Sequence, residues 1–96
     1  MSIARINQFR AKDGRGEDLW QLLQSVVALV RAAPGSEFVR LLQQEDDPTR
    51  LAIIEVWSTR EAHEAAAATV PHELVEKATD MLDLRPHGDF YRIYGS

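Results

Sequence analysis

The run from Arg50 to Trp57 limits the fold of this chain more than any other feature. It is rich in β-branched residues, as strands are, and it ends directly before Ser58, where a helix-start signal begins. Successive side chains of a strand point to opposite faces of the sheet. Both faces of this strand are apolar: Leu51, Ile53 and Trp57 share one, and Ala52, Ile54 and Val56 share the other. The strand therefore predicts a sheet that needs apolar cover on both sides.

A helix is expected directly after this strand. Ser58 and Glu61 match the capping box, in which the serine oxygen accepts a backbone N–H and the glutamate accepts one from the cap residue. The alanine run 65–68 continues the helix. Pro71 interrupts it and is well placed as the first residue of a further helix.

Three further strands and one long helix complete the expected elements. Residues 2–9 mix apolar with polar side chains in a run too short for a helix, so they predict a first strand. Leucines and valines over 19–30 recur at the spacing of one helix face, and this helix stops before Pro34-Gly35. Residues 36–44 and 89–94 alternate, and the former should form a hairpin with the strand that follows it.

The resulting order, βαββααβ, predicts a single α+β domain over residues 1–96. Its fold would be ferredoxin-like, with the helices on one face of an antiparallel sheet. The opposite face stays apolar, and covering it gains about 25 cal/mol per Å² of apolar area. We therefore expect a homodimer in which two such sheets pack face to face.

Composition excludes several classes of partner. The 96 residues carry 15 acidic and 11 basic side chains, a net charge of -4 that would not gather phosphates, so neither nucleic acid nor an anionic membrane is expected. No window approaches the roughly 20 apolar residues that span a bilayer. With no cysteine there is no disulfide framework or thiolate site, and we expect a cytoplasmic protein. The three histidines have no regular short spacing, so no metal site is predicted.

Four side chains could take part in chemistry, and each also has a plain structural role. Trp57 could stack on an aromatic ligand and donate its N–H to a carbonyl, or it could be part of the core. His72 and His63 could each accept a proton near neutral pH, or lie in solvent. Asn7, an amide within an apolar strand, could orient a ligand oxygen or bond a neighbouring strand.

Three more polar residues alternate with apolar ones. Arg40, Arg92 and Tyr94 would offer cations and a hydroxyl to an anionic ligand if they share one face. The alternative is ion pairing across the dimer, with Glu37 and Glu55 as partners, and we favour that interpretation.

Several short motifs, in order and over nearly the full length, resemble one known family. They are Ala33-Pro34-Gly35 before a strand, the turn 45–50 between strands, Glu55-Val56-Trp57-Ser58 leading into Arg60-Glu61-Ala62, and Pro71-His72 at a helix start. The chain resembles the antibiotic biosynthesis monooxygenase family, dimeric ferredoxin-like α+β barrels that include small quinol monooxygenases.

This resemblance implies oxygenation of an aromatic, quinol or polyketide-derived ring by O₂ without a cofactor, in a pocket between sheet and helices. For such a reaction we expect His72 or His63 as the base, with Trp57 as a stacking wall and Asn7 as an orienting amide. His72 matches a proline-histidine step of the family. The chain departs from the family on the second helix, where Ala66 stands at the position, nine residues after the tryptophan, that is often histidine.

Two other functions remain open at this point. Haem-degrading relatives of the same fold use an asparagine on the first strand, a tryptophan at the end of the third and a helix histidine, and Asn7, Trp57 and either histidine supply these types. A dimer that binds a hydrophobic metabolite without catalysis would explain Ala66 equally well.

Overall fold

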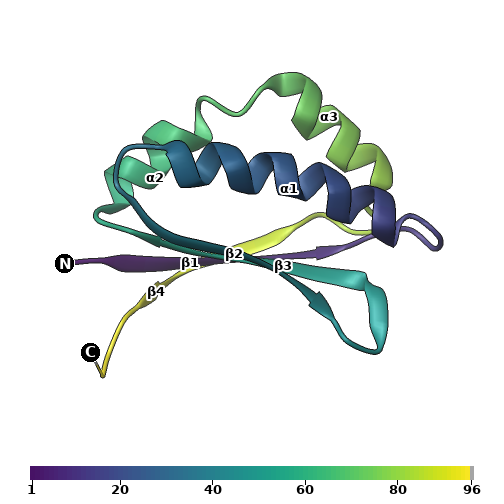
Figure 1. The fold of residues 1–96 in the computed structure, drawn as a ribbon, viewed down its shortest axis with the longest axis horizontal. Helices are drawn as coiled ribbons and strands as arrows, with labels where there is room; N and C mark the ends of the chain where they lie inside the picture. Colours follow the sequence, from purple (N-terminus) through teal and green to yellow (C-terminus); the bar gives the residue numbers. More distant parts are fainter. Residues whose placement is uncertain (96) are drawn as a thin grey trace.

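The computed structural model describes residues 1–95. Its strands pair into one antiparallel sheet, which Figure 1 shows edge-on. Four strands lie in the order β2-β3-β1-β4. Their bounds are β1 (Ile3–Arg10), β2 (Ser36–Gln44), β3 (Asp47–Trp57) and β4 (His87–Arg92). With three helices between them, the order βαββααβ and the ferredoxin-like α+β fold are confirmed.

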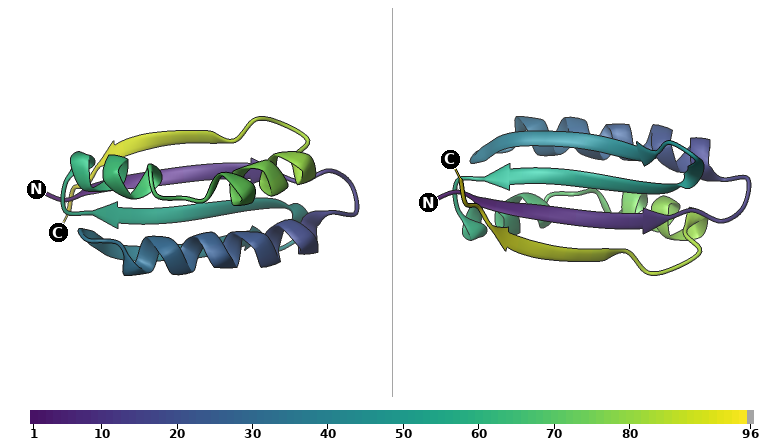
Figure 2. Two further views of the ribbon diagram at one scale, coloured as in Figure 1. Left: turned by 90° about the horizontal axis from the view of Figure 1, so that it is seen from above. Right: turned by 90° about the horizontal axis from the view of Figure 1, so that it is seen from below.

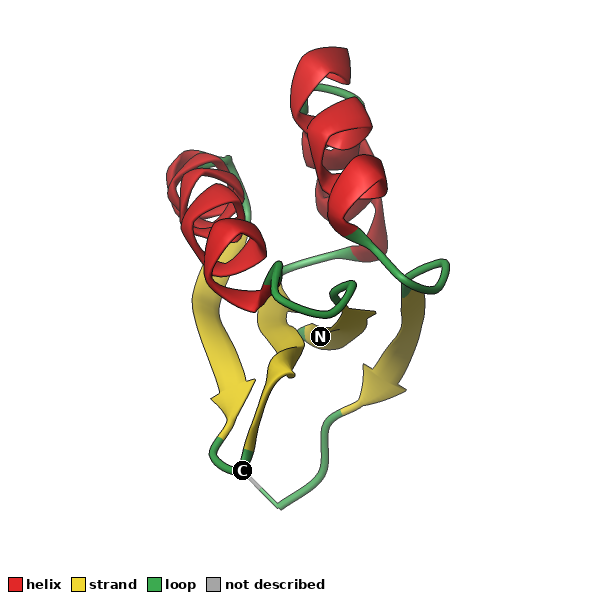
Figure 3. Ribbon diagram, turned by 90° about the vertical axis from the view of Figure 1, so that its right-hand side faces the viewer, coloured by secondary structure: helices red, strands yellow, loops and turns green. Residues whose placement is uncertain are grey.

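All three helices lie on the same face of the sheet, as the views from above and below show (Figure 2). They are α1 (Gly16–Ala32), α2 (Arg60–Ala67) and α3 (His72–Met81). The predicted stripe of α1 is its buried side, formed by Leu19, Leu23, Val27 and Val30. In contrast, α2 and α3 have no fully buried residue. They lie beside α1 on the same side of the sheet (Figure 3), and α3 contacts α1.

The register of the central strands decides which side chains face the helices. In β1 and β3, Arg5 lies opposite Glu55 and Ile3 lies opposite Trp57. Trp57 is only 1% exposed, so this set faces the helices. The intervening residues face the other way, where none of the helices and strands described for residues 1–95 covers the sheet (Figure 2).

The start of α2 differs by one residue from the sequence prediction. Thr59, not Ser58, is the N-cap, and its Oγ1 accepts the backbone N–H of Ala62 at 3.0 Å. The backbone N–H of Ser58 donates to the carbonyl of Gly35 at 2.8 Å. This bond holds Ser58 to the turn just beyond the paired strands, and the helix begins one position later than expected.

Three strands also differ in their bounds, and β1 runs over Ile3–Arg10 instead of 2–9. β3 begins at Asp47 instead of Arg50, because Asp47 pairs with Gln44 and leaves only a short turn. The expected last strand, 89–94, is shifted toward the N-terminus, since His87 and Gly88 already pair with β1.

Among the helices of residues 1–95, none has both the length and the hydropathy needed to cross a membrane.

Candidate functional site

A small cavity of about 160 Å³ lies where α2 diverges from α1 above the central strands. Its polar and aromatic lining consists of Asn7 from β1, Glu55 and Trp57 from β3, and His63 from α2. Valines of α1 and alanines of α2 complete the wall. The cavity thus brings together Trp57, Asn7 and one of the two candidate histidines.

Trp57 reaches this cavity because β3 ends directly below α2. Its side chain is almost fully buried, and its indole Nε1 donates to Oε1 of Glu55 at 2.7 Å. The N–H that the sequence analysis assigned to a ligand carbonyl therefore already has a partner. What Trp57 presents to a ligand is its ring.

Glu55 is the polar centre of the site, and it is the one charged residue within residues 1–95 that is fully buried. Asn7 donates from Nδ2 to its Oε2 at 3.3 Å, and Asn7 accepts in turn from Nε of Arg5 at 3.2 Å. Burial raises the pKa of the Glu55 carboxyl, while the indole of Trp57, the charge of Arg5 and the Asn7 amide oppose this rise.

Glu55 was expected as an ion-pair partner across the dimer, and the structure places it under the helices instead. The alternation along β3 already put Glu55 on the same side as Trp57. A carboxylate on the apolar side of a strand is a signal for a functional group, because burying a charge without partners is costly.

His63 offers the free polar atom of the site. Its Nδ1 is buried and has no hydrogen-bond partner among the described residues. The ring packs edge-on against Trp57, with centroids 5.6 Å apart, and against Phe90, with centroids 5.0 Å apart. Burial, followed by the charge of Arg5, lowers the pKa of His63, so the ring is neutral at pH 7 and can accept a proton or a hydrogen bond.

Two guanidinium groups border the same aromatic cluster. Arg5 lies over the Phe90 ring at 4.7 Å from its centroid, and Arg60 lies over it at 4.1 Å. Their positive charges disfavour an imidazolium at His63 and would favour an anion formed nearby. The sequence analysis did not single out Phe90, although its alternation within the last strand places it on a defined face.

The remaining candidates lie outside the cavity. The side chain of His72 is 84% exposed and pairs with Glu76 at 2.7 Å on the surface of α3. Arg40 lies on the uncovered face of the sheet, where its guanidinium stacks over Phe38 at 4.5 Å. The structure therefore does not bring either residue together with Trp57.

Arg92 and Tyr94 are exposed near the end of β4. Arg92 lies opposite Ile3 and so has the parity of the helix-covered side, unlike Arg40. Its Nη1 donates to the hydroxyl of Tyr94 at 3.3 Å. The three residues thus do not share one face.

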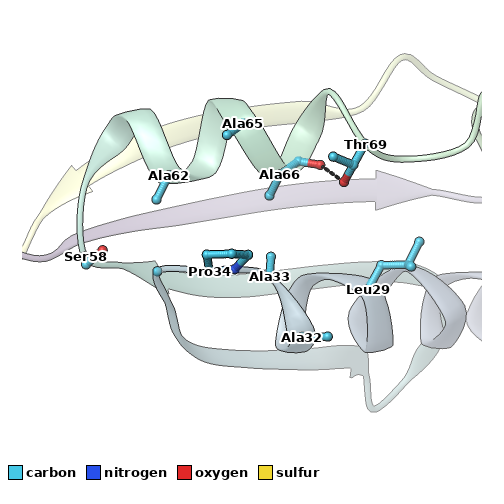
Figure 4. Close-up of a pocket in the computed structure, with 10 residues that line it drawn as sticks. Leu29, Ala32, Ala33, Pro34, Ser58, Ala62, Ala65, Ala66 and Thr69 are labelled. Carbon is cyan, nitrogen blue, oxygen red and sulfur yellow. Dashed lines mark hydrogen bonds between the residues drawn. The ribbon is translucent and has the colours of Figure 1, made fainter.

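A second, wider groove of about 610 Å³ separates α2 from the C-terminal end of α1 (Figure 4). Alanines of both helices form most of its walls, with Leu29 and Pro34. The hydroxyl of Thr69 at its rim is used locally, because it donates to the carbonyl of Ala66 at 2.7 Å. Ala66 lines both this groove and the inner cavity.

Metal ligands are not gathered anywhere in residues 1–95: no group of three His, Asp or Glu side chains is arranged to hold an ion.

Comparison with known proteins places these observations in context. The family model described as "Antibiotic biosynthesis monooxygenase" matches residues 2–77. No curated protein matches the chain significantly.

Several solved structures share the fold closely. The cofactor-independent oxygenase SnoaB from Streptomyces nogalater has a TM-score of 0.83 at 15% identity, with 99% of this chain and 95% of that chain covered. Rv0793 from Mycobacterium tuberculosis has a TM-score of 0.87 at 18% identity, covering 100% and 98% of the two chains. PA3566 from Pseudomonas aeruginosa has a TM-score of 0.82 at 25% identity, covering 97% and 95%.

Proposed function

Because the chain belongs to the antibiotic biosynthesis monooxygenase family, we propose that it is a cofactor-independent monooxygenase that oxidises a small phenolic or quinol ring with O₂. The observation that carries this proposal is the unpartnered Nδ1 of His63, in a cavity walled by the ring of Trp57. SnoaB, which is described as a cofactor-independent oxygenase, supports it through its shared fold.

The size of the cavity supports a single ring. An apolar cavity of about 150 Å³ binds benzene in a well-studied protein, and the volume here is about 160 Å³. A haem, with four pyrrole rings, does not fit such a space. The haem-degrading alternative therefore finds no support in this cavity.

The proposed reaction begins with proton transfer to His63. In the tautomer that carries its proton on Nε2, the neutral ring accepts the phenolic proton at Nδ1. The resulting anion is electron-rich and reduces O₂ directly, while the guanidinium of Arg5 stabilises negative charge at the site. For a hydroquinone, one oxygen atom enters the ring as the hydroxyquinone forms and the other leaves as water. The ring supplies all four electrons, so no other reductant is needed.

Oxygen uptake with a panel of single-ring hydroquinones tests this function. His63→Ala should lower the rate by roughly a hundredfold, the scale of a general base. His72→Ala decides between the two candidate histidines and should keep the wild-type rate, and His87→Ala serves as a surface control. Uptake no faster than in the absence of protein, across the whole panel, would contradict the proposal.

Ligand binding without turnover has a separate signature. In a Trp20→Phe background, where Trp57 is the single indole, quenching of its fluorescence by hydroquinones without oxygen consumption would show a binder of hydrophobic metabolites. Oxygen uptake by the same variant with the same ligands distinguishes the two outcomes.

We also propose that the protein acts as a homodimer in the cytoplasm. The uncovered face of the sheet exposes Phe38, Leu42 and Tyr91 by 41 to 45% each, and a second copy would cover them. The absence of cysteine supports a cytoplasmic location, because the chain contains no disulfide bond that would need an oxidising compartment.

A further inference from the structure

A glutamate at position 55 is unexpected from packing alone. From Leu51 to Trp57, Glu55 is the one polar residue of β3. The neighbours of Glu55 on the helix-covered face are Ile53 and Trp57, both 1% exposed. Glu55 itself is 5% exposed. Taking a carboxylate out of water at this position needs several donors in return.

Both carboxylate oxygens have such donors, and the donors are side chains of the cavity. Oε1 accepts the indole N–H of Trp57, and Oε2 accepts the amide of Asn7. Asn7 is held at its other end by Arg5. Arg5, Asn7, Glu55 and Trp57 therefore form one connected chain of hydrogen bonds across β1 and β3.

A second acceptor lies close to the indole of Trp57. The ring of His63 stands edge-on to it, with a centroid separation of 5.6 Å, and Nδ1 of His63 is buried without a partner. A buried indole N–H must find an acceptor. Without Glu55, Nδ1 of His63 would be an acceptor beside the indole that has no partner among residues 1–95.

We propose that Glu55 is a positioning residue that keeps the indole N–H of Trp57 away from His63, so that Nδ1 of His63 stays free for the ligand. This inference rests on the proposed function, because it assigns Nδ1 the role of proton acceptor. It also explains why Trp57 does not offer its indole N–H to the cavity, since the carboxylate accepts it. One N–H of Asn7 is held by the same carboxylate, which fixes the amide beside the indole.

Three variants test the inference. Glu55→Leu removes both acceptor oxygens, so the indole N–H should turn to His63. Glu55→Gln keeps one carbonyl oxygen for Trp57 but sets its amide against the amide of Asn7. Adding Asn7→Asp to Glu55→Gln reverses the second contact, because the new amide can donate to the new carboxylate. The double variant also keeps the net charge of the site.

The primary measurement is nuclear magnetic resonance in a Trp20→Phe background, which leaves Trp57 as the single indole. In Glu55→Leu the indole N–H resonance should move, and the Nδ1 resonance of His63 should change as it gains a hydrogen bond. Glu55→Gln should shift the indole less. Glu45→Gln, in an exposed turn, is the matched control and should leave both signals in place.

The kinetic measurement is oxygen uptake with the same hydroquinones. Glu55→Leu should lower kcat by about tenfold, the scale of one hydrogen bond to a charged group, with a smaller change in KM. Glu55→Gln should lose less, and the double variant should recover most of that loss.

The possible results separate the two hypotheses. Unchanged indole and imidazole signals in the Leu and Gln variants would overturn the positioning role. Changed signals with unaltered kcat in an active enzyme would overturn its link to the base. Changed signals together with a wild-type protein that consumes no oxygen would support the positioning contact and reject the proposed function. If Glu55→Leu does not fold, the Gln and double variants still give each of these results.

Discussion

Burial shifts the pKa values of the two titratable residues that line the cavity in opposite directions. It raises the pKa of Glu55 and lowers that of His63, because in each case the surroundings disfavour the charged form. The donors to Glu55 stabilise its charged form in part, whereas Nδ1 of His63 has no hydrogen-bond partner among residues 1–95. At the scale of single residues, both carboxylate oxygens of Glu55 accept hydrogen bonds, whereas the neighbouring Nδ1 of His63 accepts none from residues 1–95.

The lowered pKa of His63 predicts how stability depends on pH. Below its ordinary value of 6.5, the unfolded chain binds a proton at this histidine more readily than the folded chain does. The stabilising contribution is therefore fully present above 6.5 and is lost as pH falls through the folded pKa. His63→Phe keeps an aromatic ring beside Trp57 but cannot take up a proton.

Urea denaturation at about pH 7.5 and about pH 5.5 checks this prediction. The wild-type protein should lose more unfolding free energy between the two than His63→Phe does. Because Glu55 is present in both proteins, its own titration cancels in the comparison. An equal loss in the two proteins would contradict the assignment of a lowered pKa to His63.

Replacing Trp57 by phenylalanine tests the wall of the cavity. The substitution keeps an aromatic ring but removes the donor to Glu55, so we expect a loss of about 1–3 kcal/mol in unfolding free energy. Hydroquinone binding, followed by calorimetry, should weaken roughly tenfold as stacking area is lost. Trp57 lies on the helix-covered face, so sedimentation should find the association state unchanged. Dissociation on dilution would instead place the indole in an interface.

At the scale of elements, the turn before β2 fixes where α2 starts. Gly35 has a φ of +86°, and a Cβ at this position would lie 2.6 Å from Cβ of Ala62 and 2.9 Å from Oγ of Ser58. The carbonyl of Gly35 also accepts the backbone N–H of Ser58. This turn therefore touches the first turn of α2 from below and sets its distance from the sheet.

Gly35→Ala should be markedly destabilising, and Gly14→Ala is its matched control. Both glycines have positive φ, but a Cβ at Gly14 would meet nothing within 4 Å. The control should cost about 1–2 kcal/mol from backbone strain alone. Gly35→Ala should cost roughly 3 kcal/mol, because the clash with Ala62 is added. Thermal unfolding of both variants measures the difference, and equal melting temperatures would show that the turn does not support α2.

Periodicity in the sequence predicted the element order, and local hydrogen bonds moved the boundaries. The stripe of α1 and the alternation of β3 depend on burial that the whole fold enforces, so they can be read from residue types. The cap of α2 depends on whether the N–H of Ser58 is already used by Gly35, a contact between distant parts of the chain. Neighbouring residues alone do not contain that information.

The candidate site was predictable only in part, for a related reason. Alternation places Asn7, Glu55 and Trp57 on particular faces, and Trp57 and Asn7 were named on that basis. Whether His63 or His72 joins them depends on the rotation and tilt of two short helices that have no buried residue of their own. The sequence analysis therefore left both histidines open, and the packing of α2 brings only His63 to the cavity.

At the scale of the whole molecule, the sheet has one covered face and one uncovered face. Ile54 lies near the middle of the uncovered face, between Ile6 of β1 and Arg40 of β2 in the register. Water can reach this face in a single chain, so a charged residue there would not prevent folding. In the proposed dimer the same residue would be enclosed between two sheets, where an unpaired charge is costly.

Ile54→Lys should therefore give a folded monomer. The twofold relation of a homodimer would bring two added charges into one interface, next to Arg40 of each copy, so the expected penalty is several kcal/mol. Sedimentation should show a dimer for the wild-type protein and a monomer for the variant at equal concentration, with unchanged circular dichroism. Leu29→Lys adds the same charge on the helix side, in the groove beside α2, and should remain dimeric.

Since the residues that line the cavity belong to one chain, monomeric Ile54→Lys should still bind hydroquinone. A wild-type protein that sediments as a monomer, or a variant that stays dimeric, would contradict the face-to-face arrangement.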